Sequence, residues 1–145
     1  MEPIIKYYKN GQKRCEKWLR YNNRHRINGP TNQSWYEDGQ KSCEEWCEND
    51  KRHRIDGPAY QSWYPNGQKK YEEWFIDNLY HRIDGPAIQG WYGNVHKWCE
   101  EWWINGKWIK DPKPYKTWLI DNNLFEKWPW NDEELVLWRL TWDFG

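Results

Sequence analysis

Two strings near the middle of the chain indicate its fold: Trp63-Tyr64-Pro65-Asn66-Gly67-Gln68-Lys69-Lys70-Tyr71-Glu72-Glu73-Trp74 and, shortly after it, His81-Arg82-Ile83-Asp84-Gly85-Pro86. Residues 59–64 and 69–76 are rich in β-forming side chains, and the Asn-Gly pair between them predicts a hairpin with a type I′ turn. The connection 77–86 contains an Asp-Gly-Pro turn and is too short for a crossover helix. The stretch therefore predicts two antiparallel strands and a second reversal of the chain.

The same stretch recurs with a period of 28 residues, so the chain is built from sequence units. The shared positions form tryptophan columns and two sets of turn residues. The columns are Trp18, Trp46, Trp74, Trp102 and Trp130, and then Trp35, Trp63 and Trp91; the turns contain Gly11, Gly39 and Gly67, and Gly29, Gly57 and Gly85 before Pro30, Pro58 and Pro86. We predict an all-β fold, an antiparallel β-meander of about four hairpin units with about nine or ten strands.

The predicted register assigns side chains to the two faces of the sheet. A two-residue loop pairs Gln61 with Glu72 and Trp63 with Lys70, which places these four side chains on one face together with Trp74. Both faces then carry aromatic and charged residues, unlike the sheet of a β-sandwich, which is apolar on one face only. We therefore expect a single-layer sheet.

The pattern changes near the C-terminus, within what we predict to be one continuous domain. Residues 1–114 hold the four units, and 115–145 hold a degenerate last hairpin and a C-terminal cap. Asn131 followed by three acidic residues is typical of a helix start, although alternating leucines leave a strand open for 132–142. An open array of units requires such a cap.

Composition limits the classes of function. The chain has 145 residues with 22 basic and 22 acidic side chains, so no net charge attracts nucleic acid. Its mean hydropathy is -1.32, but 15 tryptophans supply the apolar area that a folded chain needs. No run is apolar enough for a membrane span or a signal peptide. We expect a protein of the cytosolic side, neither secreted nor transmembrane.

A polar stripe between the tryptophan columns is the candidate ligand site. It consists of Gln33, Glu44, Gln61, Glu72, Gln89 and Glu100. One interpretation is structural: Gln–Glu hydrogen bonds across the strands, with a tryptophan over Lys70. The other is a platform for sugars or for a partner's backbone. A flat stripe lacks the two facing carboxylates of a glycosidase, and no nucleophile motif is present, so we predict no enzyme activity.

The histidines, arginines and cysteines also recur. His25, His53 and His81 lie in equivalent loops about 10 Å apart, too far to share a metal ion, so we expect them to bond the turn backbone. The neighbouring arginines, Arg26, Arg54 and Arg82, are candidate anion contacts. The cysteines, Cys15, Cys43, Cys47 and Cys99, are too far apart for disulfides and are expected to be free thiols in a reducing compartment. No cofactor is predicted.

The strings WYPNGQKKYEEW and HRIDGPA resemble MORN-variant repeats, over roughly residues 4–120. The longer form of the unit is similar to the MORN-repeat proteins that large DNA viruses of amoebae, notably the marseillevirus group, encode in many copies. The resemblance implies a single antiparallel sheet that serves as a scaffold or attachment module. It also implies a viral protein, with a place in the virion or viral factory, and no catalytic residue.

These observations predict a non-enzymatic structural or protein-interaction module. The first alternative is a module that binds anionic membrane surfaces through Lys13, Lys41, Lys69 and the arginine row, and the second is a glycan platform. Residues 4–9 form an edge strand, and unpaired edges invite partners. We therefore expect a homodimer through one end of the sheet or through the C-terminal cap.

Overall fold

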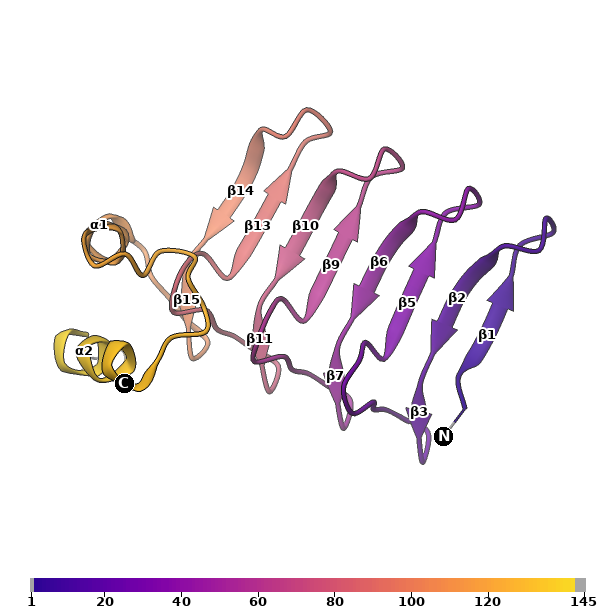
Figure 1. Cartoon of the computed structure of the whole chain (residues 1–145), viewed down its shortest axis with the longest axis horizontal. Coiled ribbons are helices and arrows are strands. Elements are labelled where there is room, and N and C mark those ends of the chain that lie inside the picture. The colour runs from indigo at the N-terminus through magenta and orange to yellow at the C-terminus, as the bar shows by residue number, and fades with distance from the viewer. Residues whose placement is uncertain (1, 143–145) are drawn as a thin grey trace.

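The computed structural model describes residues 2–142 and is built on an antiparallel sheet of eight strands (Figure 1). The order in the sheet, β1-β2-β5-β6-β9-β10-β13-β14, places each hairpin beside the next one in the chain. These strands are Ile4–Tyr7 (β1), Lys13–Lys17 (β2), Asn32–Trp35 (β5), Lys41–Glu45 (β6), Tyr60–Trp63 (β9), Lys69–Glu73 (β10), Ile88–Trp91 (β13) and Lys97–Glu101 (β14). The prediction of a largely β fold with a large antiparallel sheet is confirmed. Residues 1 and 143–145, the ends of the predicted regions 1–114 and 115–145, lie outside the described residues.

Eight further strands pair into four small two-stranded ribbons, which lie in a row beyond one set of strand ends of the large sheet. We call this side of the sheet the ribbon edge. They are Leu19–Arg20 (β3) with Asn23–Arg24 (β4), Cys47–Glu48 (β7) with Lys51–Arg52 (β8), Phe75–Ile76 (β11) with Leu79–Tyr80 (β12), and Trp103–Ile104 (β15) with Lys107–Trp108 (β16). The predicted strand 69–76 therefore breaks at Trp74 into β10 and β11, and the predicted nine or ten strands were too few. Both central residues of each ribbon turn have positive φ, for example 50° at Asp77 and 66° at Asn78, as a type I′ turn requires.

The Asn-Gly turn differs from the prediction. In the turn of the β9–β10 hairpin only Gly67 has positive φ, at 80°, and its amide donates to the Tyr64 carbonyl at 2.9 Å. Asn66 lacks the positive φ of a type I′ turn. The arrangement is that of a type I turn followed by a glycine bulge. The type I′ geometry occurs in the ribbons instead.

This bulge shifts the register beside the turn. Gln61 pairs with Glu72, as predicted, but Trp63 pairs with Lys69 rather than with Lys70. One residue of shift moves a side chain to the other face. Lys69 therefore joins the face of Glu72, to which it bonds at 2.6 Å, while Lys70 lies over Tyr64 on the opposite face.

The predicted degenerate hairpin over residues 115–128 is wrong, because its first half is helix α1 (Lys113–Asp121). Tyr115 and Leu119, four positions apart, are its buried residues, so the apolar spacing is helical. Pro114 lies in the first turn, where a missing amide hydrogen costs no helical bond. The β-forming residues in this segment therefore gave a misleading signal.

The C-terminal helix α2 (Asp132–Thr141) resolves the choice left open for 132–142. Asn131 Oδ1 accepts a bond from the Glu134 amide at 2.9 Å, and the Glu134 carboxylate accepts one from the Asn131 amide at 2.9 Å. This reciprocal pair is a capping box, which stabilises a helix start.

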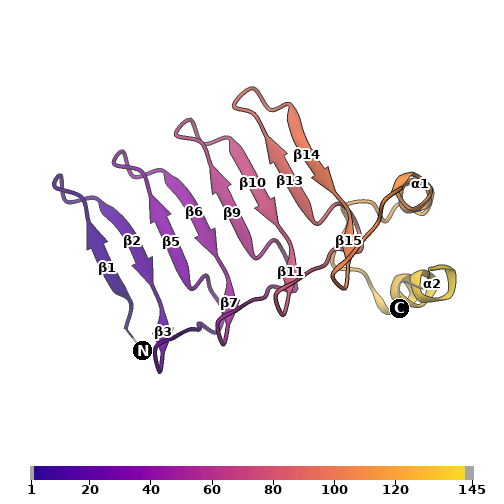
Figure 2. The same cartoon turned by 180° about the vertical axis from the view of Figure 1, so that it is seen from behind.

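The hydrophobic core lies at one end of the molecule. Its buried residues are Ile83, Trp102, Ile104, Tyr115, Leu119, Leu124 and Trp130, with Trp118, Phe125, Trp128 and Trp138 packed against them. We call α1, α2 and the segment between them the cap. Figures 1 and 2 show both helices beyond the β14–β15 end of the sheet, over neither face. The rest of the sheet is one layer thick.

Candidate functional site

The Glu/Gln stripe lies on one face of the sheet and links neighbouring units. Glu72 Oε1 accepts from Gln89 at 2.7 Å, and Oε2 accepts from Lys69 at 2.6 Å. Glu44 makes the same bonds to Gln61 at 2.8 Å and Lys41 at 2.7 Å. Each of these glutamines therefore bonds the glutamate of the preceding unit. The sequence had predicted a bond to the glutamate of the same hairpin. The other stripe members, Gln33 and Glu100, lie on β5 and β14.

Glu16 and Glu44 have lowered pKa values, which favours their charged form. The Lys13 hydrogen bond lowers the pKa of Glu16, the equivalent residue of the first unit, and the Trp18 indole adds to this effect. Burial opposes ionisation of Glu44, but the Lys41 ammonium and the Trp46 indole outweigh it, so its pKa is also lowered. Carboxylates that are ionised and already hydrogen-bonded are structural ties between side chains.

The lysines of this face lie over tryptophans of the next unit. The Nζ atoms of Lys13, Lys41 and Lys69 lie 5.2, 5.6 and 5.8 Å from the ring centres of Trp35, Trp63 and Trp91, respectively. Each lysine also pairs with the glutamate three residues later. The second tryptophan column is therefore half-buried under cations. The predicted contact of Lys70 with this column does not occur.

The three candidate anion-binding arginines are engaged inside the protein. The guanidinium carbons of Arg26, Arg54 and Arg82 lie 4.2, 4.0 and 4.1 Å from the rings of Trp18, Trp46 and Trp74. They also face Glu16, Glu44 and Glu72 at 3.7, 3.8 and 3.5 Å, and they donate to the carbonyls of Pro30, Pro58 and Pro86. A Cβ on Gly57 would come within 2.8 Å of Arg54, so glycine is needed where the arginine crosses its loop.

The loop histidines bond the turn backbone, as predicted. The Nδ1 atoms of His25, His53 and His81 accept from the amides of Asn49, Asp77 and Asn105 at 3.4, 3.3 and 3.2 Å. Each acceptor holds the ribbon turn of the following unit. Burial lowers the pKa of His81, which keeps its ring neutral and able to accept this bond.

The opposite face carries a charged ladder that the sequence reasoning missed. Glu45 accepts from Arg24 at 2.9 Å and from Arg52 at 2.7 Å, and Arg52 reaches on to Glu73 at 3.1 Å. Tyr80, at the arginine position of the next unit, donates to Glu73 at 2.7 Å. The sequence does contain a signal for this ladder, because Arg24 and Arg52 are 28 residues apart, as are Glu45 and Glu73.

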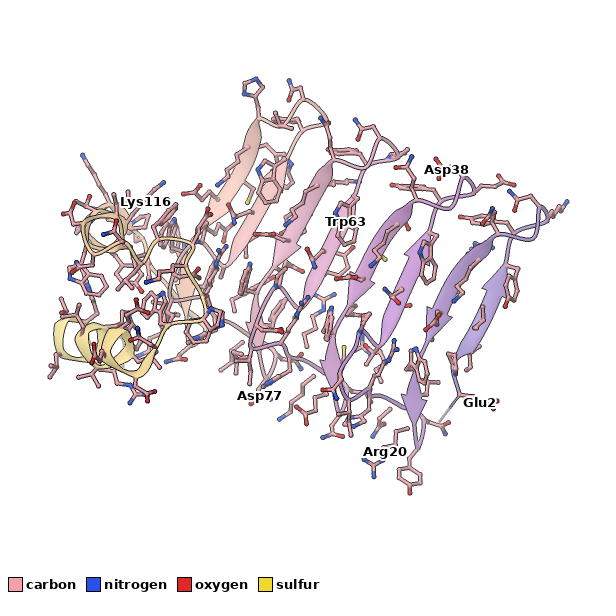
Figure 3. All side chains as sticks on the ribbon, viewed as in Figure 1. Glu2, Arg20, Asp38, Trp63, Asp77 and Lys116 are labelled. Carbon is pink, nitrogen blue, oxygen red and sulfur yellow. The ribbon has the colours of Figure 1, made fainter. Side chains whose placement is uncertain are left out.

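A tyrosine column adds a further tie between units. The hydroxyls of Tyr8, Tyr36 and Tyr64 donate to the main-chain carbonyls of Trp35, Trp63 and Trp91 at 2.9, 2.8 and 3.0 Å. In Figure 3, Trp63 lies on the sheet, Asp38 at a hairpin tip, and Arg20 and Asp77 at the ribbon edge. Polar ties between units therefore occur both on the sheet and along its ribbon edge.

The first tryptophan column changes character along the chain. Trp18, Trp46 and Trp74 are half-buried, whereas Trp102 is 2% exposed. Trp130, the expected fifth member, lies in the cap instead, where it donates to the Leu124 carbonyl at 3.3 Å. The same residue type is thus a surface tie in three units and a core residue near the cap.

The cysteines and acidic residues form no cluster suited to a metal. Cys15, Cys43, Cys47 and Cys99 are free thiols, of which Cys47 is buried. Across residues 2–142, no three His, Cys, Asp or Glu side chains gather closely enough to hold an ion. In the same span, no helix has the length and apolar character needed to cross a bilayer.

The two ends of the sheet differ. At the C-terminal end, Lys116 of α1 lies 3.5 Å from Glu100 on β14, and the cap packs on Trp102. The outermost strand has one partner at both ends, β13 for β14 and β2 for β1, but no helix lies beside β1 within the described chain, so its outer edge is open. Ile4 is 52% exposed on this strand.

Comparison with known proteins adds no relative: no family model, curated protein or solved structure matches the chain.

Proposed function

We propose that the protein is a non-enzymatic repeat scaffold of the MORN type, which assembles with a second copy of itself through β1. The open edge of β1 is the observation that carries the proposal. β5, β9 and β13, the strands at the same position in the other units, have a partner on both sides, whereas β1 has one. An unpaired edge offers a row of main-chain donors and acceptors to another strand.

The side chains of β1 favour one antiparallel register between two copies. Residues directly opposite one another must lie on the same face, so one residue lies opposite its own copy and the two-fold axis passes between them. An axis at Lys6 would oppose two ammonium groups, which is destabilising. An axis at Ile5 opposes two isoleucines and places Ile4 opposite Lys6. We therefore place the axis at Ile5, which gives one continuous sheet across both copies.

The alternatives receive less support from the side chains. Lys13, Lys41 and Lys69 are each paired with a glutamate, and the arginine row faces carboxylates, which leaves little positive potential for an anionic membrane. A glycan platform needs exposed ring faces, and lysines lie over the second tryptophan column. Free thiols suit the cytosolic side of a cell. The proposal of a virion or viral-factory setting depends on the resemblance alone.

The test is the mass of the protein in solution, measured by light scattering during size-exclusion chromatography. We expect twice the chain mass of 18.2 kDa for the unmodified protein and the monomer mass for Ile5→Lys. The equivalent positions in the other units are Gln33, Gln61 and Gln89, so a polar residue is compatible with the fold there. Ile27→Lys, at a residue that is 73% exposed and far from β1 in the sequence, is the matched control and should remain a dimer. A monomer mass for the unmodified protein would contradict the proposal.

A further inference from the structure

Two loops of identical sequence have opposite surroundings. His53-Arg54-Ile55-Asp56-Gly57-Pro58 and His81-Arg82-Ile83-Asp84-Gly85-Pro86 share the bond from the arginine Nε to the aspartate Oδ1, at 2.8 Å in both. Their aspartate side chains are 74% exposed at Asp56 and 2% exposed at Asp84. The isoleucines differ in the same way, with Ile55 64% and Ile83 6% exposed. The two loops therefore show the same aspartate with and without a cover, although the Trp128 indole does donate to the Ile55 carbonyl of the first loop.

The cover of the second loop is a peptide segment of the chain itself. The Glu126 amide donates to the main-chain carbonyl of Asp84 at 2.7 Å, and the Trp128 amide donates to Asp84 Oδ2 at 3.0 Å. Two main-chain donors, two residues apart, thus bind one aspartate. At Asp56 the corresponding Oδ2 and carbonyl have no such donor from residues 2–142, although Oδ1 is held in the same way.

A cavity opens between loop 53–58 and the covered loop. It has a volume of about 190 Å³, and its lining combines the apolar side chains of Ile55, Trp74, Ile76, Ile83 and Trp128 with the polar ones of Arg54, His81, Arg82 and Asp84. A cavity of about 150 Å³ is large enough to take a benzene ring. The cavity can therefore accept one aromatic or large aliphatic side chain beside Ile55, the residue that precedes Asp56.

We infer that the loop 53–58 and this cavity bind an extended peptide segment of a partner protein. The segment offers two main-chain amides, at positions i and i+2, to the carbonyl and Oδ2 of Asp56. A flanking aromatic or large aliphatic side chain fills the cavity. The chain's own segment on Asp84 supplies the chemistry of this occupant. An acidic ligand is disfavoured, because it would face the Asp56 carboxylate.

The site is separate from the edge of β1. Asp77, which contacts His53 of this loop at 3.1 Å, lies in Figure 3 at the ribbon edge of the sheet. β1 is the strand at the far end from the cap. A dimer through β1 and a peptide on loop 53–58 can therefore form independently, and each has its own disabling variant.

The test uses a fluorescently labelled peptide with the sequence of residues 122–128, NNLFEKW, titrated into the whole protein while fluorescence anisotropy is recorded. We expect binding with a dissociation constant below about 1 mM. Asp56→Asn keeps one oxygen for Arg54 but loses the second acceptor, and it should weaken binding about ten- to a hundredfold, the effect of one charge-assisted hydrogen bond. A peptide with alanine in place of Leu124 and Phe125 should bind at least about tenfold more weakly, because it cannot fill the cavity.

Glu37→Ala, which removes one negative charge at a hairpin tip, is the matched control and should bind the peptide like the unmodified protein. Ile5→Lys should also bind it normally, whereas Asp56→Asn should keep the dimer mass. Circular dichroism checks that each variant is folded. Absence of binding at about 1 mM peptide, or equal binding by Asp56→Asn, would overturn the inference. Equal binding would also show that the peptide had only displaced the segment on Asp84.

Discussion

The two ends of this molecule use the same residue type in different ways. Near the cap, Trp102 is 2% exposed and packs against Tyr115 and Phe125 at centre distances of 5.9 and 6.2 Å. In the second unit, Trp46 is half-buried, and an arginine lies over its ring. The cap region is thus held mainly by apolar burial, whereas the first three units are held by backbone pairing, ion pairs and cation–π contacts. The position of a residue in a sequence column therefore does not determine how much its side chain stabilises the fold.

A substitution of the same residue at both ends tests this comparison most strongly. Trp102→Ala should lower the free energy of unfolding by about 3–5 kcal/mol, because it leaves a cavity in the only region with a closed core among residues 2–142. Trp46→Ala should cost about 1–2 kcal/mol, since much of its ring already faces solvent or Arg54. Guanidinium unfolding measures both variants. Equal losses would mean that the column is a uniform packing spine.

The charged ladder on the opposite face gives the next largest effect. Glu45→Ala removes the acceptor shared by Arg24 and Arg52 and should cost about 2 kcal/mol, as expected for bonds to charged groups. Glu48→Ala, at an exposed carboxylate on the adjacent ribbon, should change stability by less than about 0.5 kcal/mol. Both variants lose one negative charge, so the difference between their free energies of unfolding in urea measures the effect of the ladder and not that of the net charge. No difference between them would show that the ladder adds nothing to the contacts between units.

The sequence was informative where the unit period or a capping pattern acts locally. The Asn-Gly turn predicted a hairpin and the pairing of Gln61 with Glu72, the period of 28 residues predicted that the hairpin recurs, and Asn131 predicted a helix start. The period could not say which glutamine bonds Glu72, because Gln61 and Gln89 pair with it from the two neighbouring strands. That choice depends on side-chain directions in the assembled sheet.

Other features were hidden by competing local signals. Asn66-Gly67 suggested a type I′ turn, but the equivalent glycines of the first three hairpins all follow a type I turn as a bulge, including the two hairpins with Lys9 or Glu37 at the position of Pro65. The segment of α1 is rich in β-forming residues, and only the burial of Tyr115 and Leu119 against Trp102 selects the helix. Tertiary packing at the cap thus overrode local propensity. The covered and uncovered aspartates, Asp84 and Asp56, have identical sequence contexts and differ only in the folded chain.

The hairpin turns allow a smaller and opposite test, in which a substitution stabilises the protein. The fourth turn has Val95 at φ 64°, where the first three have Gly11, Gly39 and Gly67 at φ 80–87°. A β-branched residue is strained in this region. Val95→Gly should therefore raise the free energy of unfolding by about 1 kcal/mol, after the entropic cost of glycine is subtracted. Gly39→Val should lower it by about 1–3 kcal/mol, and thermal unfolding measures both. A loss on Val95→Gly would show that the turn is relaxed.

The smallest effect concerns pH at the boundary between the two regions. His81 accepts the Asn105 amide in its neutral form, and burial lowers its pKa below the ordinary value of 6.5. The unfolded chain therefore binds this proton more readily than the folded chain does. The stabilisation is complete above pH 6.5 and is lost as the pH falls from 6.5 through the lowered pKa of the folded state. His81→Asn keeps an acceptor for the Asn105 amide without a titrating ring. We expect its free energy of unfolding, measured in urea between about pH 7.5 and 5.5, to fall less than that of the unmodified protein. Parallel curves would show that His81 takes up its proton equally well in both states.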